Sequence, residues 1–124
     1  MKITVGTDIV EIERIKKILA EKPFLARYFS EDEQAEYYQR GEKTEYIAGS
    51  FCAKESFSKA VGTGVRGFEL REVQVLRDDL GKPHLTLTGN AKTLAEAQGL
   101  AFDVSISHTK EYATAVVIAY TVQE

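Results

Sequence analysis

The segment from Gly49 to Gly64, GSFCAKESFSKAVGTG, is the most informative part of this chain. When residues are placed at about 100° per step, large apolar side chains gather in one sector of a helix, and small side chains fill most of the remainder. The large residues are Ile47, Phe51, Phe57 and Val61, and the small ones are Ala48, Cys52, Ala53 and Ala60. Because a helix that is apolar nearly all round is usually buried, the pattern predicts a buried helix from about Thr44 to Val61.

Three charged residues, Lys54, Glu55 and Lys59, interrupt this helix, and a Gly62-Thr63-Gly64 loop ends it. Unpaired burial of an ion is costly, so these charges need partners. Glu55 and Lys59 share a face at i,i+4, either as a helix-stabilising pair worth about 0.2–0.5 kcal/mol or facing something anionic or metallic. Lys54 projects within the apolar sector, which predicts a stem packed on apolar surface and an amine directed to a ligand or to solvent.

The rest of the chain predicts helices first and strands afterwards. Isoleucines at three- to four-residue spacing indicate an amphipathic helix, and Ser30 with Glu33 forms a capping box for a later one. After Gly64 the period becomes two, which is typical of strands. The expected strands are 2–7, 72–77, 84–88, 102–107 and 112–121; the expected helices are 9–22, 24–29, 31–40, 44–61 and a short one that Asn90 caps and Gly99 ends. We expect one α+β domain over residues 1–124, with N-terminal helices packed on a mainly antiparallel sheet.

Composition indicates an ordinary soluble protein. The 124 residues carry a net charge of −3 and 44% hydrophobic residues, and no apolar run is long enough to span a bilayer. This charge, without a dense Lys/Arg block, argues against nucleic acid as a partner, and we expect no membrane partner. The N-terminus lacks a signal-peptide pattern and Cys52 has no second cysteine, so we expect a cytoplasmic protein in which Cys52 is a small buried thiol rather than a nucleophile.

Asp8 and Glu55 are the candidate metal ligands. Asp8 follows the expected first strand, where it is also placed to cap the next helix. Two carboxylates supply the hard oxygen ligands with which Mg²⁺ is usually held, together with water and substrate phosphates. There is no Cys/His cluster that suits zinc. The Gly62-Thr63-Gly64 loop allows close backbone approach of a ligand and an anion-binding nest, although it is equally an ordinary glycine C-cap.

His108 opens a polar loop with Ser105, Ser107 and Thr109. A Ser-His-Asp hydrolase that uses Asp103 is a weak alternative, because the spacing is local and the chain has no G-x-S-x-G elbow. A loop that hydrogen-bonds a phosphate or a base is the favoured interpretation.

Three separated motifs together resemble the holo-acyl-carrier-protein synthases, the small bacterial 4'-phosphopantetheinyl transferases. They are VGTDIVEIERI at the N-terminus, the central FCAKESFSKAVGTG, and SISHTKEYA near the C-terminus, and the resemblance covers nearly the whole chain. It implies Mg²⁺-dependent transfer of 4'-phosphopantetheine from coenzyme A to a serine of apo-acyl carrier protein in fatty acid biosynthesis, with release of adenosine 3',5'-bisphosphate. It also implies a homotrimer whose nucleotide sites are shared between neighbouring subunits.

The resemblance further implies roles for individual residues. Asp8 and Glu55 match the family's Mg²⁺ ligands, and Lys59 matches its lysine beside the pyrophosphate; we expect Glu55 to accept the serine proton, directly or through water. The expected coenzyme A contacts are Lys54, Gly62, Thr63, Gly64, Lys82, Pro83, Ser107, His108 and Thr109. Many relatives have an arginine, associated with contact to a nucleotide phosphate, where this chain has Ser50.

Basic residues are concentrated near the N-terminus, with five of them against three acidic residues between Glu11 and Arg27. Arg14 and Lys17 share a helix face at i,i+3, and Arg27 lies just beyond. One interpretation is a solvated helix face. Since acyl carrier proteins are small and acidic, the resemblance instead implies that Arg14, Lys17 and Arg27 attract the carrier.

Two other function classes remain open. A non-catalytic coenzyme A or nucleotide-binding module predicts ligand binding without Mg²⁺ dependence and no modification of a carrier. A metal-dependent phosphohydrolase predicts phosphate release from small substrates without a protein acceptor.

Overall fold

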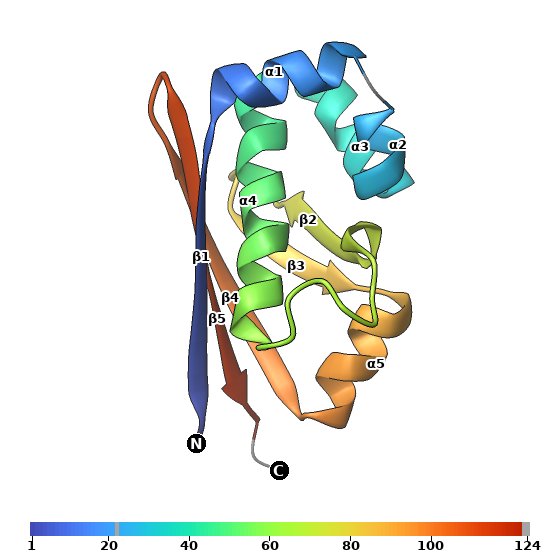
Figure 1. Cartoon of the computed structure of the whole chain (residues 1–124), viewed down its shortest axis with the longest axis vertical. Coiled ribbons are helices and arrows are strands. Elements are labelled where there is room, and N and C mark those ends of the chain that lie inside the picture. Colours follow the sequence, from blue (N-terminus) through green and yellow to red (C-terminus); the bar gives the residue numbers. More distant parts are fainter. Residues whose placement is uncertain (22, 123–124) are drawn as a thin grey trace.

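A long helix packed across one face of a three-stranded antiparallel sheet forms the centre of the computed structural model, which describes residues 1–21 and 23–122 (Figure 1). The sheet has the order β1-β5-β4, and a separate two-stranded sheet joins β2 to β3. The strands are β1 (Ile3–Glu11), β2 (Val73–Arg77), β3 (Pro83–Leu87), β4 (Leu100–His108) and β5 (Tyr112–Thr121). The helices are α1 (Ile12–Glu21), α2 (Phe24–Tyr28), α3 (Glu31–Gln39), α4 (Thr44–Ala60) and α5 (Gly89–Ala97), with a 3-10 turn η1 (Leu70–Glu72) before β2. The predicted α+β class with an antiparallel sheet is confirmed.

The central helix α4 is buried, as its apolar pattern predicts. Ile47 and Phe57 have no exposed surface. Strand β1 lies very close to the helix at Gly6, because a Cβ atom on that residue would be 1.9 Å from the backbone oxygen of Ser56. Only glycine permits this approach, which holds the side chains that follow Gly6 on the inner face of β1 against the second half of α4.

The first strand is longer than predicted, and the interpretation of Asp8 as a helix cap is wrong. β1 continues to Glu11, so Asp8 lies inside the strand and pairs with Ala115 of β5. Ile9, predicted to begin a helix, is 63% exposed on the outer face of the sheet. The prediction failed because Ile9 fits two patterns: its three-residue spacing to Ile12 suits a helix, and its alternation with Ile3 and Val5 suits a strand. Since side chains alternate along a strand, Gly6 and Asp8 face α4.

Other boundaries are close to those predicted, except for one cap. The Ser30–Glu33 capping box of α3 is confirmed. Helix α5 has Thr88 in its N-cap position, so Asn90 is not the cap. Lys22, in the first predicted helix, and residues 123–124 lie outside the described residues. In the described part of the chain, no helix combines the length and apolar character needed to cross a membrane.

Several large apolar side chains are exposed on the outer face of the three-stranded sheet, opposite α4, in the described structure. Its large apolar side chains lie on β1 and β5 and expose 40–63% of their surface; they are Ile3, Val5, Ile9, Tyr112 and Ile118. Exposed apolar side chains gathered on one face of a sheet make that face a candidate interaction surface.

Candidate functional site

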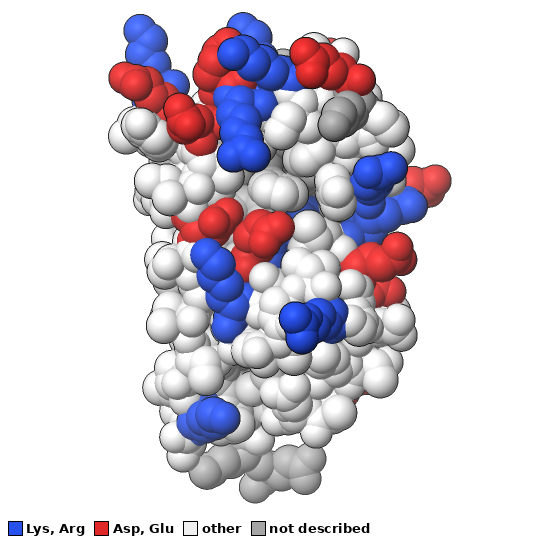
Figure 2. All heavy atoms as spheres, in the orientation of Figure 1, with Lys and Arg blue, Asp and Glu red and all other residues white. Residues whose placement is uncertain are grey.

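Asp8 of β1 and Glu55 of α4 line one cavity of about 300 Å³, together with Arg14 of α1. Burial raises the pKa of Glu55, the nearby Asp8 raises it further, and Lys59 lowers it. Two carboxylates therefore share a space in which their negative charges repel each other. Figure 2 shows acidic and basic side chains side by side over this seam between β1 and α4. The pair has the electrostatic character of a cation site.

Lys59, one helical turn after Glu55, joins α4 to β1. Its Nζ donates a hydrogen bond to the carbonyl of Thr7 at 2.8 Å and lies 3.6 Å from Oδ1 of Asp8. The Lys59 side chain is 54% exposed, so its amine is also accessible to a ligand. Among the described residues the ion pair of Lys59 is with Asp8, not with Glu55, so the alternative of a routine i,i+4 pair is not what the structure contains.

The donor atoms at this site fit Mg²⁺. Among residues 1–21 and 23–122, no third Asp, Glu, His or Cys joins Asp8 and Glu55 to form a larger metal-binding group. Mg²⁺ typically takes one or two protein carboxylates and completes its coordination with water and substrate phosphate oxygens. The two carboxylates therefore suit a metal ion that arrives with a phosphorylated substrate.

An apolar groove of about 710 Å³ opens beside Glu55. Its walls include Ile18, Phe24 and Phe51, and Arg27 also lines it. Of the three residues predicted to attract a carrier, Arg14 thus lines the carboxylate cavity and Arg27 the groove, whereas Lys17 is exposed on α1 and lines neither. The groove places apolar surface and positive charge next to the candidate catalytic carboxylate.

A second pocket, of about 520 Å³, lies at the β4 edge of the sheet. It brings together Pro83 and His108, two of the expected coenzyme A contacts, with Gly81 of the turn before Pro83. Its other residues, which sequence reasoning missed, are Arg40, Lys43, Glu45, Tyr46, Arg77 and Ile106. They come from α4, β2, β4 and the segment between α3 and α4, so no local motif marks them; charge was a signal for Arg40, Lys43, Glu45 and Arg77 alone.

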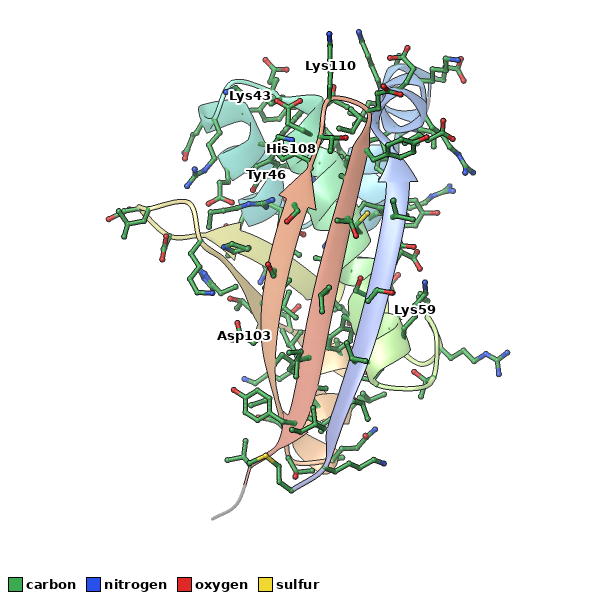
Figure 3. The ribbon with its side chains drawn as sticks, turned by 90° about the vertical axis from the view of Figure 1, so that its left-hand side faces the viewer. Lys43, Tyr46, Lys59, Asp103, His108 and Lys110 are labelled. Atoms are coloured by element: carbon green, nitrogen blue, oxygen red, sulfur yellow. The ribbon has the colours of Figure 1, made fainter. Side chains whose placement is uncertain are left out.

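The carboxylate cavity and the second pocket lie at opposite edges of the sheet. Asp8 on β1 and Ile106 on β4 pair with the same residue of the middle strand, Ala115, and α4 packs across the face between them. Figure 3 shows Lys43, Tyr46 and His108 at the β4 edge and Lys59 beyond the β1 edge. Because a helix with its side chains is about 10 Å wide, α4 separates the two sites within one chain.

Several predicted site residues lie outside the second pocket. Ser107 alternates with His108 along β4 and therefore faces the outer side of the sheet. The hydroxyl of Thr109 accepts hydrogen bonds from the backbone N–H groups of Glu111 and Tyr112, so it stabilises the hairpin turn. Within this loop, His108 is the residue that the structure places in the pocket.

The Ser-His-Asp alternative is not supported by the geometry. Asp103 lies five residues before His108 on β4, a separation of about 17 Å along an extended strand. Its carboxylate instead lies 3.7 Å from the amine of Lys82, and both side chains are exposed. Lys82 therefore lies on the surface beside the second pocket, whereas its neighbour Pro83 lines it.

The Gly62-Thr63-Gly64 loop is a C-cap. Gly62 and Gly64 have φ values of 83° and 63°, which favour glycine. Their N–H groups donate to the carbonyls of Lys59 and Ser58, at 3.1 and 3.2 Å. Because these two amides already have partners within the chain, they do not form the anion-binding nest considered from the sequence. Close approach of coenzyme A to this exposed loop stays a prediction.

The prediction that Lys54 directs its amine to a ligand or to solvent is wrong. Its side chain has no exposed surface, and its Nζ donates hydrogen bonds to Oε1 of Glu33 at 2.8 Å and to the carbonyls of Leu70 and Val73 at 2.9 and 2.6 Å. Burial lowers the pKa of Lys54 to about 8, against the effect of Glu33, which raises it. All three protons of an ammonium group are thus used to join α4 to α3 and to the start of β2.

Cys52 is a buried thiol, as predicted. It has no exposed surface and its Sγ contacts the carbonyl of Ala113 at 3.4 Å. Burial, followed by the charge of Asp8, raises the pKa of Cys52 to about 12. A thiol with so high a pKa in the core is a poor nucleophile.

Residues 4–117 match the model of the 4'-phosphopantetheinyl transferase superfamily. A holo-[acyl-carrier-protein] synthase of Caldanaerobacter subterraneus is 46% identical over 121 residues, which cover 96% of this chain and 95% of that relative. The crystal structure of the holo-[acyl-carrier-protein] synthase from Neisseria meningitidis superposes with a TM-score of 0.88 at 34% identity, over 95% of this chain and 98% of that one. An enzyme–coenzyme A complex from Chronobacterium ammoniagenes superposes with a TM-score of 0.85 at 32% identity, over 99% of this chain and 100% of that one.

Proposed function

Since the chain belongs to the holo-[acyl-carrier-protein] synthases of the 4'-phosphopantetheinyl transferase superfamily, we propose that Asp8, Glu55 and Lys59 transfer 4'-phosphopantetheine from coenzyme A to a serine of apo-acyl carrier protein. The other product is adenosine 3',5'-bisphosphate. The observation that supports this most directly is the convergence of Asp8, Glu55 and Lys59 beside an apolar groove. Such a reaction supplies the carrier for fatty acid biosynthesis.

Asp8, Glu55 and Lys59 have separate roles in the transfer. A new P–O bond forms between the serine oxygen and the phosphorus that carries pantetheine, and the bond from that phosphorus to the bridging oxygen of the diphosphate breaks. Glu55, which lines both the carboxylate cavity and the groove, accepts the serine proton directly or through water. The Lys59 amine stabilises the negative charge on the leaving phosphate. Mg²⁺ held by Asp8 and Glu55 would neutralise and align the diphosphate.

Mass spectrometry of the carrier tests the proposed reaction. The chain is incubated with coenzyme A, Mg²⁺ and an apo-acyl carrier protein, and we expect the carrier to gain the mass of one phosphopantetheine. No gain on a carrier that a known synthase modifies would overturn the proposal. Coenzyme A binding without Mg²⁺ dependence would then indicate a non-catalytic module, and release of inorganic phosphate without a carrier would indicate a phosphohydrolase.

The basic residues near Glu55 support an acidic protein partner. Arg14 and Arg27 line the cavities that contain Glu55, and we propose that with Lys17 they attract the acyl carrier protein by charge, while its apolar side chains enter the groove. Figure 2 shows acidic and basic side chains mixed over α1, so the attraction depends on the few basic groups nearest the cavities.

We predict that Arg14→Glu raises the KM for the carrier about tenfold and weakens the dependence of that KM on salt, because the substitution replaces attraction by repulsion. The KM for coenzyme A should change little. Steady-state kinetics at several salt concentrations measure both effects. Lys92→Glu, the same charge reversal on an exposed residue of α5, is the control and should leave the carrier KM unchanged. An unchanged KM for Arg14→Glu would indicate that this helix face is only solvated and does not attract the carrier.

The outer face of the sheet supports assembly into a trimer. The exposed apolar side chains there, on the neighbouring strands β1 and β5, are Ile3, Val5, Ile9, Tyr112 and Ile118. We propose that three copies pack through this face around a threefold axis, which brings the β4 edge of one copy beside the β1 edge of the next. The second pocket of one subunit then lies beside the carboxylate cavity of its neighbour. One coenzyme A molecule can therefore contact both sites, although α4 separates them within one chain.

Mixed trimers test this sharing of sites. We pair Glu55→Gln with a variant whose second pocket lacks two basic side chains, Lys43→Ala/His108→Ala, each expected to be inactive alone. Co-expression should restore about one quarter of the wild-type activity, because in a cyclic trimer a site is intact when one subunit supplies the carboxylates and its neighbour the pocket. No recovery from mixed trimers, or a monomer in sedimentation, would contradict shared sites.

A further inference from the structure

The guanidinium group of Arg77 lies half-buried in the second pocket and has no carboxylate partner. It comes from the end of β2, its Nη1 donates to Oγ of Ser50 at 2.5 Å, and its carbon Cζ lies 4.0 Å from the ring centroid of Tyr46. Burial lowers the pKa of Arg77. Within the described residues Arg77 forms no ion pair, and its Nε and Nη2 donate no hydrogen bond to the protein.

The nearest carboxylate is already engaged elsewhere. Glu36 accepts hydrogen bonds from the hydroxyl of Tyr46 and from the backbone N–H of Arg77, and it pairs with Arg40 at 3.8 Å. The Arg77 side chain is therefore half-buried, held in place by Ser50 and Tyr46, and one of the residues that line the second pocket; its Nε and Nη2 have no protein acceptor among the described residues. A guanidinium presented in this way fits a phosphate, which it can bind through two parallel hydrogen bonds.

We propose that Arg77 binds the 3'-phosphate of coenzyme A and so makes this enzyme prefer coenzyme A over its 3'-dephospho form. The inference rests on the proposed function and on sites shared between subunits. Coenzyme A has two anionic groups, the diphosphate and the 3'-phosphate. The diphosphate is the reacting group and lies with Asp8, Glu55 and Lys59 at the β1 edge of a neighbouring subunit. The 3'-phosphate is the anion that remains for a basic pocket at the β4 edge.

Ser50 explains how the guanidinium reaches this place. Ser50 is buried on α4, and its hydroxyl oxygen accepts the hydrogen bond from Nη1 of Arg77. Because the Ser50 hydroxyl contacts the Arg77 guanidinium, an arginine at position 50 would start beside the same pocket, and we infer that it is an alternative way to deliver the same charge. In this chain the charge comes from β2 rather than from α4.

Binding of coenzyme A and of 3'-dephospho-coenzyme A, measured by calorimetry in the presence of Mg²⁺, tests the assignment. The wild type should bind coenzyme A about 10- to 100-fold more tightly than the dephospho form, as expected for a charge-assisted hydrogen-bonded pair. In Arg77→Ala this preference should fall below about threefold, while the affinity for the dephospho form changes little. Arg77→Lys, which keeps the charge but loses the planar fork, should give an intermediate preference.

A double variant, Ser50→Arg/Arg77→Ala, tests the position of the charge and guards against an effect of misfolding. It should regain most of the preference for coenzyme A. Equal weakening of both ligands by Arg77→Ala, or an unchanged preference, would overturn the inference; so would a folded double variant that binds the dephospho form normally but shows no preference. If the wild type modifies no carrier and binds no coenzyme A, the proposed function itself fails, whereas normal transfer with an unchanged preference refutes only the role of Arg77.

Discussion

Replacing Glu55 with Gln is expected to lower the rate of carrier modification by about 10²–10⁴-fold while coenzyme A still binds measurably. The amide cannot accept the serine proton and is a poorer metal ligand than a carboxylate. Single-turnover transfer followed by mass spectrometry measures the rate, and calorimetry measures binding. A rate within tenfold of the wild type would reject Glu55 as the base.

The same variant has a readout that does not depend on activity. Burial and the charge of Asp8 raise the pKa of Glu55, so the ionised carboxylate is destabilised in the folded protein. A neutral Gln removes that repulsion, and in metal-free buffer Glu55→Gln should melt at or above the temperature of the wild type. Mg²⁺ should raise the melting temperature of the wild type but not of the variant. Glu96→Gln, on the exposed side of α5, is the matched control and should retain the response to Mg²⁺.

Replacing Lys54 with Met is expected to lower the free energy of unfolding by about 3–5 kcal/mol. The substitution keeps an unbranched apolar stem but removes the amine, so it leaves Glu33 charged and buried, and the carbonyls of Leu70 and Val73 lose a donor. Urea unfolding monitored by circular dichroism measures the change. An ordinary packing role, without the buried charge, would cost far less.

Lys82→Met is the control for this prediction, because it removes the lysine of an exposed ion pair with Asp103 and should cost less than about 1 kcal/mol. Where Lys54→Met still folds, its KM for coenzyme A should stay within a few-fold of the wild-type value, since the amine faces no ligand. A stable Lys54→Met variant with a greatly raised KM for coenzyme A would indicate that Lys54 contacts the ligand, and it would contradict the buried position of the amine.

Much of the site was predictable from the sequence because it follows local rules. The apolar surround of α4 set its burial, and the i,i+4 spacing placed Glu55 and Lys59 on one side of it. Lys54 shows where local rules end. Periodicity placed its stem correctly in the apolar sector, but its partner Glu33 is twenty-one residues away on another helix. No pattern within α4 indicates a carboxylate that reaches its core from α3.

Local sequence patterns were enough to predict the α+β class, the buried central helix, the capping box of α3 and the pair of carboxylates suited to Mg²⁺. These depend on side-chain periodicity and residue chemistry, which act over a few positions. Three relations became clear from the folded chain: Asp8 lies inside a strand, the Arg77 side chain contacts Ser50, and the carboxylates and the basic pocket lie at opposite edges of one sheet. Those relations arise from strand pairing and helix packing between distant segments, for which the local sequence contains no signal.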